Sequence, residues 1–319
     1  MGEIPTAVLS SGHTIPLIGM GTATYPVPPQ DQLISNFISA MELGYRHFDT
    51  AAVYYTEEAL GLAIAEAIRR GVVKSREELF ITSKLWCNEA HHDRVIPAVK
   101  KTLENLGLEY LDLYLIHWPL SLKPGELTFQ FKKEDLLAMD FKSVWEAMEE
   151  CQKLGLTKSI GVSNFSCKKL SDLIAVASIP PAVNQVEMHA TWQQQKLREF
   201  CKENGIHVTA WSPLGANGAT WGTLAIMESP VLKEIADAKG KTVAQVALRW
   251  LHEQGVSVVV KSFNKERMKK NIQIFDWELT KDERDQISRV PQRRGFSGEL
   301  FLSPSGPFKS VEELWDGEV

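Results

Sequence analysis

A carboxylate and a phenol five positions apart are the first residues of this chain whose types and spacing suggest chemistry. The segment GYRHFDTAAVYYTEE, residues 44–58, predicts a buried strand over residues 45–48 that ends at Asp49, with Tyr54 in the loop beyond it. A phenol has a pKa of about 10, so it donates a proton near neutral pH only where a cation lowers that pKa. We therefore expect a lysine and a polar orienting group to reach the same place from other strand ends.

The elements that must position these groups repeat one unit along the chain. In each unit an amphipathic helix ends at a glycine, such as Gly107 or Gly255, and a short apolar strand follows. Strands that are apolar along their whole length are typical of parallel sheets buried on both faces. The strands are expected over residues 17–21, 45–48, 78–84, 111–116, 158–162, 182–188, 206–210 and 256–260.

Strands alternating with helices, without a change of composition, favour a single α/β domain over residues 1–319, a (β/α)8 TIM barrel. Apolar runs around Ser11-Gly12 predict an N-terminal β-hairpin. A doubly wound sheet is less favoured, because GMGTAT has Thr24 where a dinucleotide fingerprint needs a third glycine. Long loops at the C-terminal face of the barrel should shape a substrate pocket. They are expected over residues 119–140, 215–229 and, as a C-terminal substrate loop, about 291–319.

The composition excludes several classes of function. A net charge of −5 and a pI near 6.0 argue against nucleic-acid binding. No apolar run reaches the roughly 18 residues of a membrane span, so no membrane partner is expected. The four cysteines lack paired spacing, which is typical of reduced thiols in the cytoplasm. Cys87, His91 and His92 lack a fourth ligand at a recognisable spacing, so no metal is expected.

Polar residues stand at most of the expected strand ends, where a packed core would have valine or leucine. Each alone has a structural explanation: Asp49 could cap a helix, Lys84 could extend along the surface, and His117 could be a hydrogen-bonded core residue. Such explanations would have to hold independently at several strand ends, so a shared site is favoured. The residues are Asp49, Lys84, His117, Ser163, Asn164, Gln185, Trp211, Lys261 and Ser262.

Seven segments in register resemble the aldo-keto reductase superfamily across nearly the whole chain. They are FDTAAVYYTEE, FITSKLW, LYLIHWP, IGVSNF, AVNQVEM, TAWSPLG and VVKSFNKERMKKN. MEECQKLG, SNFSCKKL and LSPSGPFK are most similar to its plant branch, which contains codeinone reductase, polyketide (deoxychalcone-type) reductase and methylecgonone reductase. The resemblance implies a monomer that reduces a small-molecule carbonyl with NADPH, through the tetrad Asp49, Tyr54, Lys84 and His117.

In the mechanism that this resemblance implies, hydride passes from the nicotinamide to the carbonyl carbon and Tyr54 protonates the oxygen. Lys84 would favour the ionised phenol, and Asp49 would hold Lys84 in place and charged. His117 would orient and polarise the carbonyl. Tyr55 is the neighbouring alternative to Tyr54, and the family register favours Tyr54.

The resemblance also implies the cofactor contacts. The nicotinamide carboxamide falls on Ser163, Asn164 and Gln185, and its ring on Trp211, where the family usually has a tyrosine. A lysine and an arginine that can pair with the 2′-phosphate favour NADPH over NADH. The complete set is Thr22, Asp49, Ser163, Asn164, Gln185, Trp211, Ser212, Leu214, Lys261, Ser262, Phe263, Asn264, Arg267 and Asn271.

One departure from the family concerns the substrate. Many members carry a tryptophan shortly after the first strand, where this chain has Ala23. Loss of an indole should widen the mouth and suit a bulky ketone, such as an alkaloid or polyketide ketone of plant specialised metabolism. Apolar walls are expected from Tyr25, Trp86, Trp118, Trp221 and Phe301.

Two other functions remain open for a chain of this kind. A Schiff-base aldolase would use a neutral Lys84 as nucleophile, which a neighbouring Asp49 disfavours. A regulatory protein could bind the nucleotide without turnover, although it would not need an intact tetrad.

Overall fold

The computed structural model describes residues 4–219 and 221–318. It opens with the expected antiparallel hairpin of β1 (Thr6–Val8) and β2 (Thr14–Pro16). Ile15 of this hairpin is fully buried in one apolar cluster with Leu113 and Leu115 of the barrel. The hairpin therefore covers one end of the barrel, and the other end is left for the site.

Within the described residues, eight parallel strands close into a barrel, which confirms the predicted (β/α)8 fold. Each strand pairs with the next barrel strand along the chain, and the last pairs with the first. The strands are β3 (Ile18–Gly21), β4 (His47–Asp49), β5 (Phe80–Leu85), β6 (Leu111–Ile116), β9 (Thr157–Ser163), β10 (Val183–Glu187), β11 (His207–Trp211) and β12 (Ser257–Val260).

The second strand starts later than the expected residues 45–48, because its ladder begins where Phe80 donates to the carbonyl of Arg46. Tyr45 lies before the strand, and its hydroxyl donates to the carbonyl of Met268 at 3.0 Å. The difference leaves Asp49 as the last residue of β4, at the end where the site was expected.

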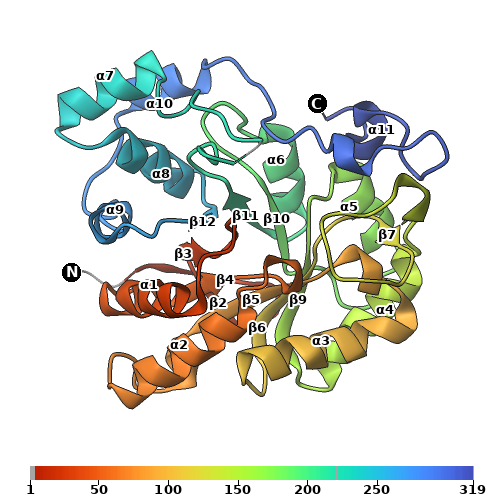
Figure 1. Ribbon diagram of the computed structural model, residues 1–319. Helices are drawn as coiled ribbons and strands as arrows, with labels where there is room; N and C mark the ends of the chain where they lie inside the picture. The colour runs from red at the N-terminus through yellow and green to blue at the C-terminus, as the bar shows by residue number, and fades with distance from the viewer. Residues whose placement is uncertain (1–3, 220, 319) are drawn as a thin grey trace.

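Helices surround the barrel (Figure 1), and apolar residues on their inner faces bury against the strands. In α2, Leu60 and Ile64 are almost fully buried, which stabilises the fold by about 1.5–3 kcal/mol for each side chain. Gly61 lets α2 approach its neighbour, because a Cβ there would overlap the carbonyl of Leu106. The barrel helices are α1 (Gln30–Glu42), α2 (Glu57–Arg69), α3 (His92–Leu106), α4 (Phe141–Lys153), α5 (Cys167–Ile174), α6 (Gln195–Glu203) and α8 (Val243–Glu253).

The connections at the C-terminal ends of the strands carry further short elements. The loop after β6 contains an antiparallel pair, β7 (Ser121–Leu122) and β8 (Leu136–Leu137). The C-terminal helix α11 lies beside α5, far away in sequence (Figure 1), because Lys169 of α5 donates to Asp316 at 2.5 Å. The remaining helices are α7 (Pro230–Lys239), α9 (Lys265–Asn271), α10 (Lys281–Ser288) and α11 (Val311–Trp315). In the described ranges, no helix has both the length and the apolar character that crossing a membrane requires.

Candidate active site

Four residues of the predicted tetrad meet at the C-terminal end of the barrel. Asp49 ends β4, Lys84 is the penultimate residue of β5, and His117 directly follows β6. Tyr54 ends a short 3-10 turn after β4. Because the strands are parallel, their carboxyl ends share one face of the barrel, and side chains far apart in sequence converge there.

The geometry joins these four side chains. The ammonium of Lys84, which is 1% exposed, donates to Oδ1 of Asp49 at 2.6 Å and to the carbonyl of Thr50 at 2.9 Å. The same ammonium lies 5.1 Å from the centre of the Tyr54 ring. The Tyr54 hydroxyl lies 3.2 Å from Nε2 of His117. A phenol and an imidazole therefore point to one spot, with a buried ion pair behind the phenol.

The electrostatics of Tyr54 differ from our expectation that a cation lowers its pKa, and that expectation is wrong. Burial raises the pKa of Tyr54, and the carboxylate of Asp49 raises it further. The reason is that Asp49 lies against Lys84, so the phenol faces an ion pair and not an isolated cation. Burial also lowers the pKa of Lys84, an effect that Asp49 opposes. Tyr54 is thus protonated at neutral pH, which is the form that a general acid requires.

His117 is neutral at the same pH. Burial lowers its pKa well below the usual value, and the charge of Lys84 lowers it further. Its ring packs edge-on against Trp86, with 5.1 Å between the ring centres. A neutral imidazole can donate or accept one hydrogen bond at Nε2 according to its tautomer, so it can orient a polar substrate atom beside Tyr54.

Four of the predicted nicotinamide contacts form one network with the tetrad. Gln185 donates from Nε2 to Oδ2 of Asp49 at 2.7 Å, and the hydroxyl of Ser163 donates to the carbonyl of Gln185 at 2.7 Å. Asn164 donates to the carbonyl of His117 at 2.9 Å. The indole of Trp211 donates to Oδ1 of Asn164 at 3.0 Å. The structure brings these residues together at the strand ends of β9, β10 and β11.

Two cations follow the last barrel strand: Lys261 comes directly after β12, and Arg267 lies in the next helix, α9. Burial lowers the pKa of Lys261, and the positive charge of Arg267 lowers it further. No carboxylate of the described residues lies within ion-pair distance of either, although Lys265 nearby pairs with Glu42 at 3.4 Å. Two cations without an acidic partner fit an anionic group such as a phosphate.

The other predicted cofactor residues are placed as follows. The side-chain oxygen of Asn264 caps α9 by accepting from the backbone amide of Arg267 at 2.9 Å. The backbone amide of Asn264 donates to the hydroxyl of Ser262 at 3.3 Å. Asn271 is 4% exposed, so its side chain faces the interior. Thr22 is buried, and its hydroxyl lies 2.8 Å from that of Thr56. Phe263 packs edge-on against Phe37. Ser212 and Leu214 follow β11 and are partly exposed. A role in holding a cofactor stays a prediction for each of these residues.

The predicted substrate walls fall into two groups. Trp86, Trp118 and Phe301 are buried, with the rings of Trp118 and Phe301 4.5 Å apart. Because Phe301 is 1% exposed, it packs against Trp118 and leaves almost no surface for a substrate. Tyr25 is 89% exposed and Trp221 41% exposed, and Ala23 is also exposed. Their contact with a substrate stays a prediction.

Two aromatic residues near the tetrad were not among the predicted site residues. Phe129 stacks on Tyr54 with 6.5 Å between the ring centres and also packs edge-on against Trp86. Phe296 of the C-terminal tail packs against Trp118 at 5.3 Å. Both stand in long irregular segments, where no periodicity indicates the direction of a side chain. The only sequence signal was their occurrence in loops expected at the C-terminal face.

The neighbouring Tyr55 points elsewhere. It adopts a left-handed conformation with φ of 57°, and its hydroxyl donates to the carbonyl of Leu127. Its side chain is 57% exposed. The turn therefore directs Tyr54 and Tyr55 to different places, and only Tyr54 lies against His117.

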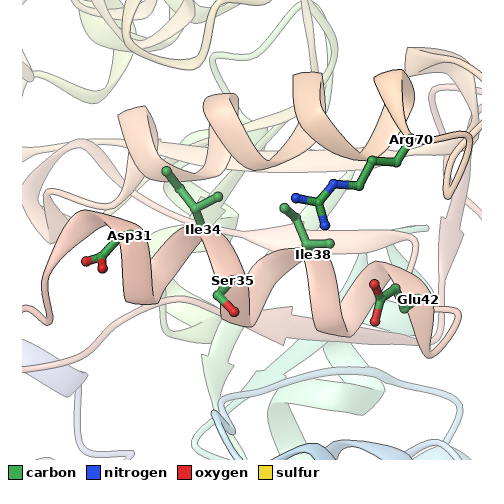
Figure 2. Close-up of a pocket in the computed structure, with 6 residues that line it drawn as sticks. All are labelled: Asp31, Ile34, Ser35, Ile38, Glu42 and Arg70. Atoms are coloured by element: carbon green, nitrogen blue, oxygen red, sulfur yellow. The ribbon is translucent and has the colours of Figure 1, made fainter.

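A groove between α1 and α2 lies on the outside of the barrel and contains no residue of the tetrad (Figure 2). Arg70 extends over it toward Ile38, and its guanidinium already donates to Glu66 at 2.6 Å. Its chemistry is that of an outer helix surface, so the strand ends are the candidate active site. The groove is lined by Asp31, Ile34, Ser35, Ile38, Glu42 and Arg70.

The fold and the converging groups define a class of barrel enzyme that acts on carbonyl groups, and comparison with known proteins identifies its family. The sequence model of the Aldo/keto reductase family matches residues 17–291. Protein REDOX 2 of Catharanthus roseus is 57% identical over 318 residues, which cover 99% of this chain and 98% of the relative. An NADPH-dependent codeinone reductase of Papaver somniferum is 59% identical over 313 residues, 98% of each chain.

A solved structure agrees with these sequence matches. The crystal structure of a Bombyx mori aldo-keto reductase in complex with NADP is 37% identical, with a TM-score of 0.85 over 94% of this chain and 97% of that chain. The chain belongs to the aldo/keto reductase family and is an oxidoreductase of carbonyl groups. The predicted resemblance to plant members of the family is confirmed by the two plant relatives.

Proposed function

We propose that the protein reduces a bulky ketone with NADPH and that Tyr54 donates the proton to the carbonyl oxygen. The observation that carries this proposal is the 3.2 Å approach of the Tyr54 hydroxyl to Nε2 of His117 beside a buried Lys84–Asp49 pair. A carbonyl oxygen at this spot accepts hydrogen bonds from both groups, which stabilises the negative charge that develops on it.

The four residues divide the work of proton transfer. NADPH, when bound, supplies the hydride. Tyr54 holds the proton and gives it to the oxygen as negative charge accumulates there. Lys84 lies 5.1 Å from the centre of the ring, and Asp49 holds it in place. Because burial and Asp49 raise the pKa of Tyr54, the phenol keeps its proton until negative charge develops on the substrate oxygen. His117 is neutral and fixes the carbonyl relative to Tyr54.

The cofactor is held at both ends. Ser163, Asn164 and Gln185 present hydroxyl and amide groups for the carboxamide of the nicotinamide, and the partly exposed Trp211 offers a face for its ring. Lys261 and Arg267 match a phosphate at the adenosine end. That pair favours NADPH over NADH, in agreement with the NADPH named for the codeinone reductase and the NADP bound in the Bombyx mori structure.

The substrate is a bulky, mostly apolar ketone of the kind found in plant specialised metabolism. Ala23 leaves space where a family tryptophan would stand, and Phe129, 51% exposed beside Tyr54, offers an aromatic surface at the same place. The similarity to a codeinone reductase supports a polycyclic alkaloid ketone as the first candidate.

We further infer a single-domain, cytoplasmic monomer. The four cysteines are free and buried, in agreement with a reducing compartment. The tail over about residues 291–319 serves as the substrate loop, because Phe296 and Phe301 pack against Trp118, the residue after His117. The net charge of −5 favours a small-molecule partner over nucleic acid.

Turnover assays test the proposal. NADPH consumption is measured with a series of carbonyls from small aldehydes through monocyclic ketones to polycyclic alkaloid ketones. We expect turnover to rise with substrate size. Tight NADPH binding without turnover of any carbonyl would favour a regulatory nucleotide-binding protein instead. A Schiff-base aldolase is disfavoured because Lys84 is 1% exposed and both of its hydrogen bonds go to the protein.

A further inference from the structure

A buried carboxylate outside the tetrad holds the C-terminal tail on the barrel. Glu187, the last residue of β10, is 3% exposed. Its Oε1 accepts from the amide of Gly295 at 3.0 Å, and its Oε2 accepts from the amide of Phe296 at 3.0 Å. One side chain of the barrel thus binds two consecutive backbone amides of a segment more than a hundred positions away in the sequence.

The surroundings of Glu187 indicate a built contact. Burying a carboxylate is unfavourable unless hydrogen bonds replace its water, and here the tail amides and Nε2 of His189, 3.0 Å from Oε1, do so. The position of Gly295 is also constrained, because a Cβ on that residue would overlap Oε1 of Glu187. A larger residue at that position would therefore force the Glu187 carboxylate to shift away from the tail amides.

The hydrogen bond from the Phe296 amide to Glu187 fixes the backbone of Phe296 next to the barrel. The ring of Phe296 packs edge-on against the indoles of Trp211 and Trp221, with 6.2 Å and 5.9 Å between the ring centres. Its ring centre also lies 5.3 Å from that of Trp118. Trp211 is the register partner of Glu187 in the barrel. Phe296 consequently lies between the indole of Trp118, the residue after His117, and the indole of Trp211, which is expected under the nicotinamide.

We infer that Glu187 is a positioning residue for substrate selection, which holds Phe296 as one wall of the site for the bulky apolar part of the substrate. This inference rests on the proposed function. A bulky ketone contacts this wall, whereas a small aldehyde reaches only Tyr54 and His117. Loss of the carboxylate should therefore affect the bulky substrate alone.

Other contacts keep the end of the tail in place without Glu187. Lys169 binds Asp316 and the carbonyl of Leu314 at 2.7 Å, and the indole of Trp315 donates to the carbonyl of Ser297 at 2.8 Å. Replacement of Glu187 thus removes the contacts of the Gly295 and Phe296 amides, while Arg293 and Ser297 on either side keep their own hydrogen bonds and α11 stays docked on α5. The change is local, so it can be separated from unfolding.

The test compares Glu187→Gln and Gly295→Ala with Glu149→Gln. Glu149 is a matched control, since it is also 3% exposed and accepts from the amides of Ser178 at 2.6 Å and Ile179 at 2.8 Å, in a different loop. For a polycyclic ketone we expect kcat/KM to fall about tenfold or more in the first two variants, as for loss of one wall contact, with a small aldehyde changed by less than about twofold. The control should keep the wild-type ratio of the two substrates.

A second readout is independent of activity. The backbone amides of Gly295 and Phe296 are bound by Glu187 in the wild type, so they should exchange hydrogen slowly. Both amides should exchange faster in Glu187→Gln and Gly295→Ala than in the wild type or in Glu149→Gln. Unchanged exchange and an unchanged substrate ratio, or an equal loss for both substrates, would overturn the inference.

The outcome for the wild type separates this inference from the proposed function. If wild-type protein turned over neither carbonyl, the proposed function would fail and the inference with it. If the wild type reduced both carbonyls and the variants kept its substrate ratio, only the inference about Glu187 would fail.

Discussion

Gln185 donates a hydrogen bond to Asp49 over 2.7 Å, while Lys84 occupies the other carboxylate oxygen at 2.6 Å. Asp49 therefore binds both Lys84, which lies next to the Tyr54 ring, and Gln185, a predicted nicotinamide contact. This arrangement also excludes the simplest structural explanation of Asp49, since the residue at the start of α2 is Thr56. The residues proposed for cofactor binding and those proposed for proton transfer therefore belong to one hydrogen-bonded network.

Discrimination between the two nicotinamide cofactors should depend on Arg267. We expect Arg267→Ala to raise the Kd for NADPH about tenfold or more, the usual cost of losing a hydrogen bond to a charged group, and to leave the Kd for NADH nearly unchanged. Fluorescence titration measures both constants. Lys270→Ala, which removes an exposed charge from the same helix, is the control. Equal weakening of both cofactors would exclude a phosphate contact for Arg267.

The width of the mouth should depend on Ala23. We expect Ala23→Trp to lower kcat/KM for a polycyclic ketone about tenfold or more, because the indole fills space that this substrate needs. Ala23 is exposed, so the larger side chain should not disturb the core. A small aldehyde, assayed in parallel, should be reduced at the wild-type rate. Unaltered reduction of the polycyclic ketone would contradict the substrate part of the proposal.

Stability should fall in mild acid because of His47 in the barrel interior. Burial lowers the pKa of His47 to about 4, and the residue is fully buried. Between pH of about 6.5 and about 4 the unfolded chain therefore binds a proton that the folded chain does not. The free energy of unfolding should decrease across this window by about 3 kcal/mol from His47 alone. Above pH of about 6.5 the group contributes no pH dependence.

Urea denaturation at the two ends of this window, with wild type and His47→Gln, measures the effect. The variant should lose less stability on acidification than the wild type by the contribution of His47. Identical losses in both proteins would mean that His47 is protonated equally in the folded and unfolded states.

The fold could be predicted from the sequence because it follows from regular periods, and the same periods place Asp49, Lys84 and His117 near strand ends. The choice of Tyr54 over Tyr55 rested on the resemblance to the family. Apolar strands and glycine-ended helices predict the barrel, and polar residues such as Lys84 and His117 stand out at strand ends. Parallel strands then bring those residues together whatever the details of the loops. The observed β5 and β6 differ from the predicted ranges by at most two residues at either end.

The rest depended on contacts that have no local pattern. Phe129 and Phe296 stand in irregular segments. Nothing in the sequence indicates that Phe129 stacks on Tyr54 or that Glu187 binds the backbone amide of Phe296. The raised pKa of Tyr54 was missed for a related reason, because it depends first on how much water the fold removes from the phenol and then on the nearby charge of Asp49. Such quantities follow from tertiary packing.

The most direct test of the mechanism is the reduction rate and NADPH affinity of Tyr54→Phe, with Tyr55→Phe as the matched control. The account predicts that Tyr54→Phe lowers kcat by about a hundredfold to ten-thousandfold, as expected for loss of a general acid, at an unchanged Kd for NADPH. Tyr55→Phe should keep nearly full activity, since its hydroxyl binds the carbonyl of Leu127. Substantial reduction by Tyr54→Phe, or a loss of activity only in Tyr55→Phe, would contradict the assignment of Tyr54 as proton donor.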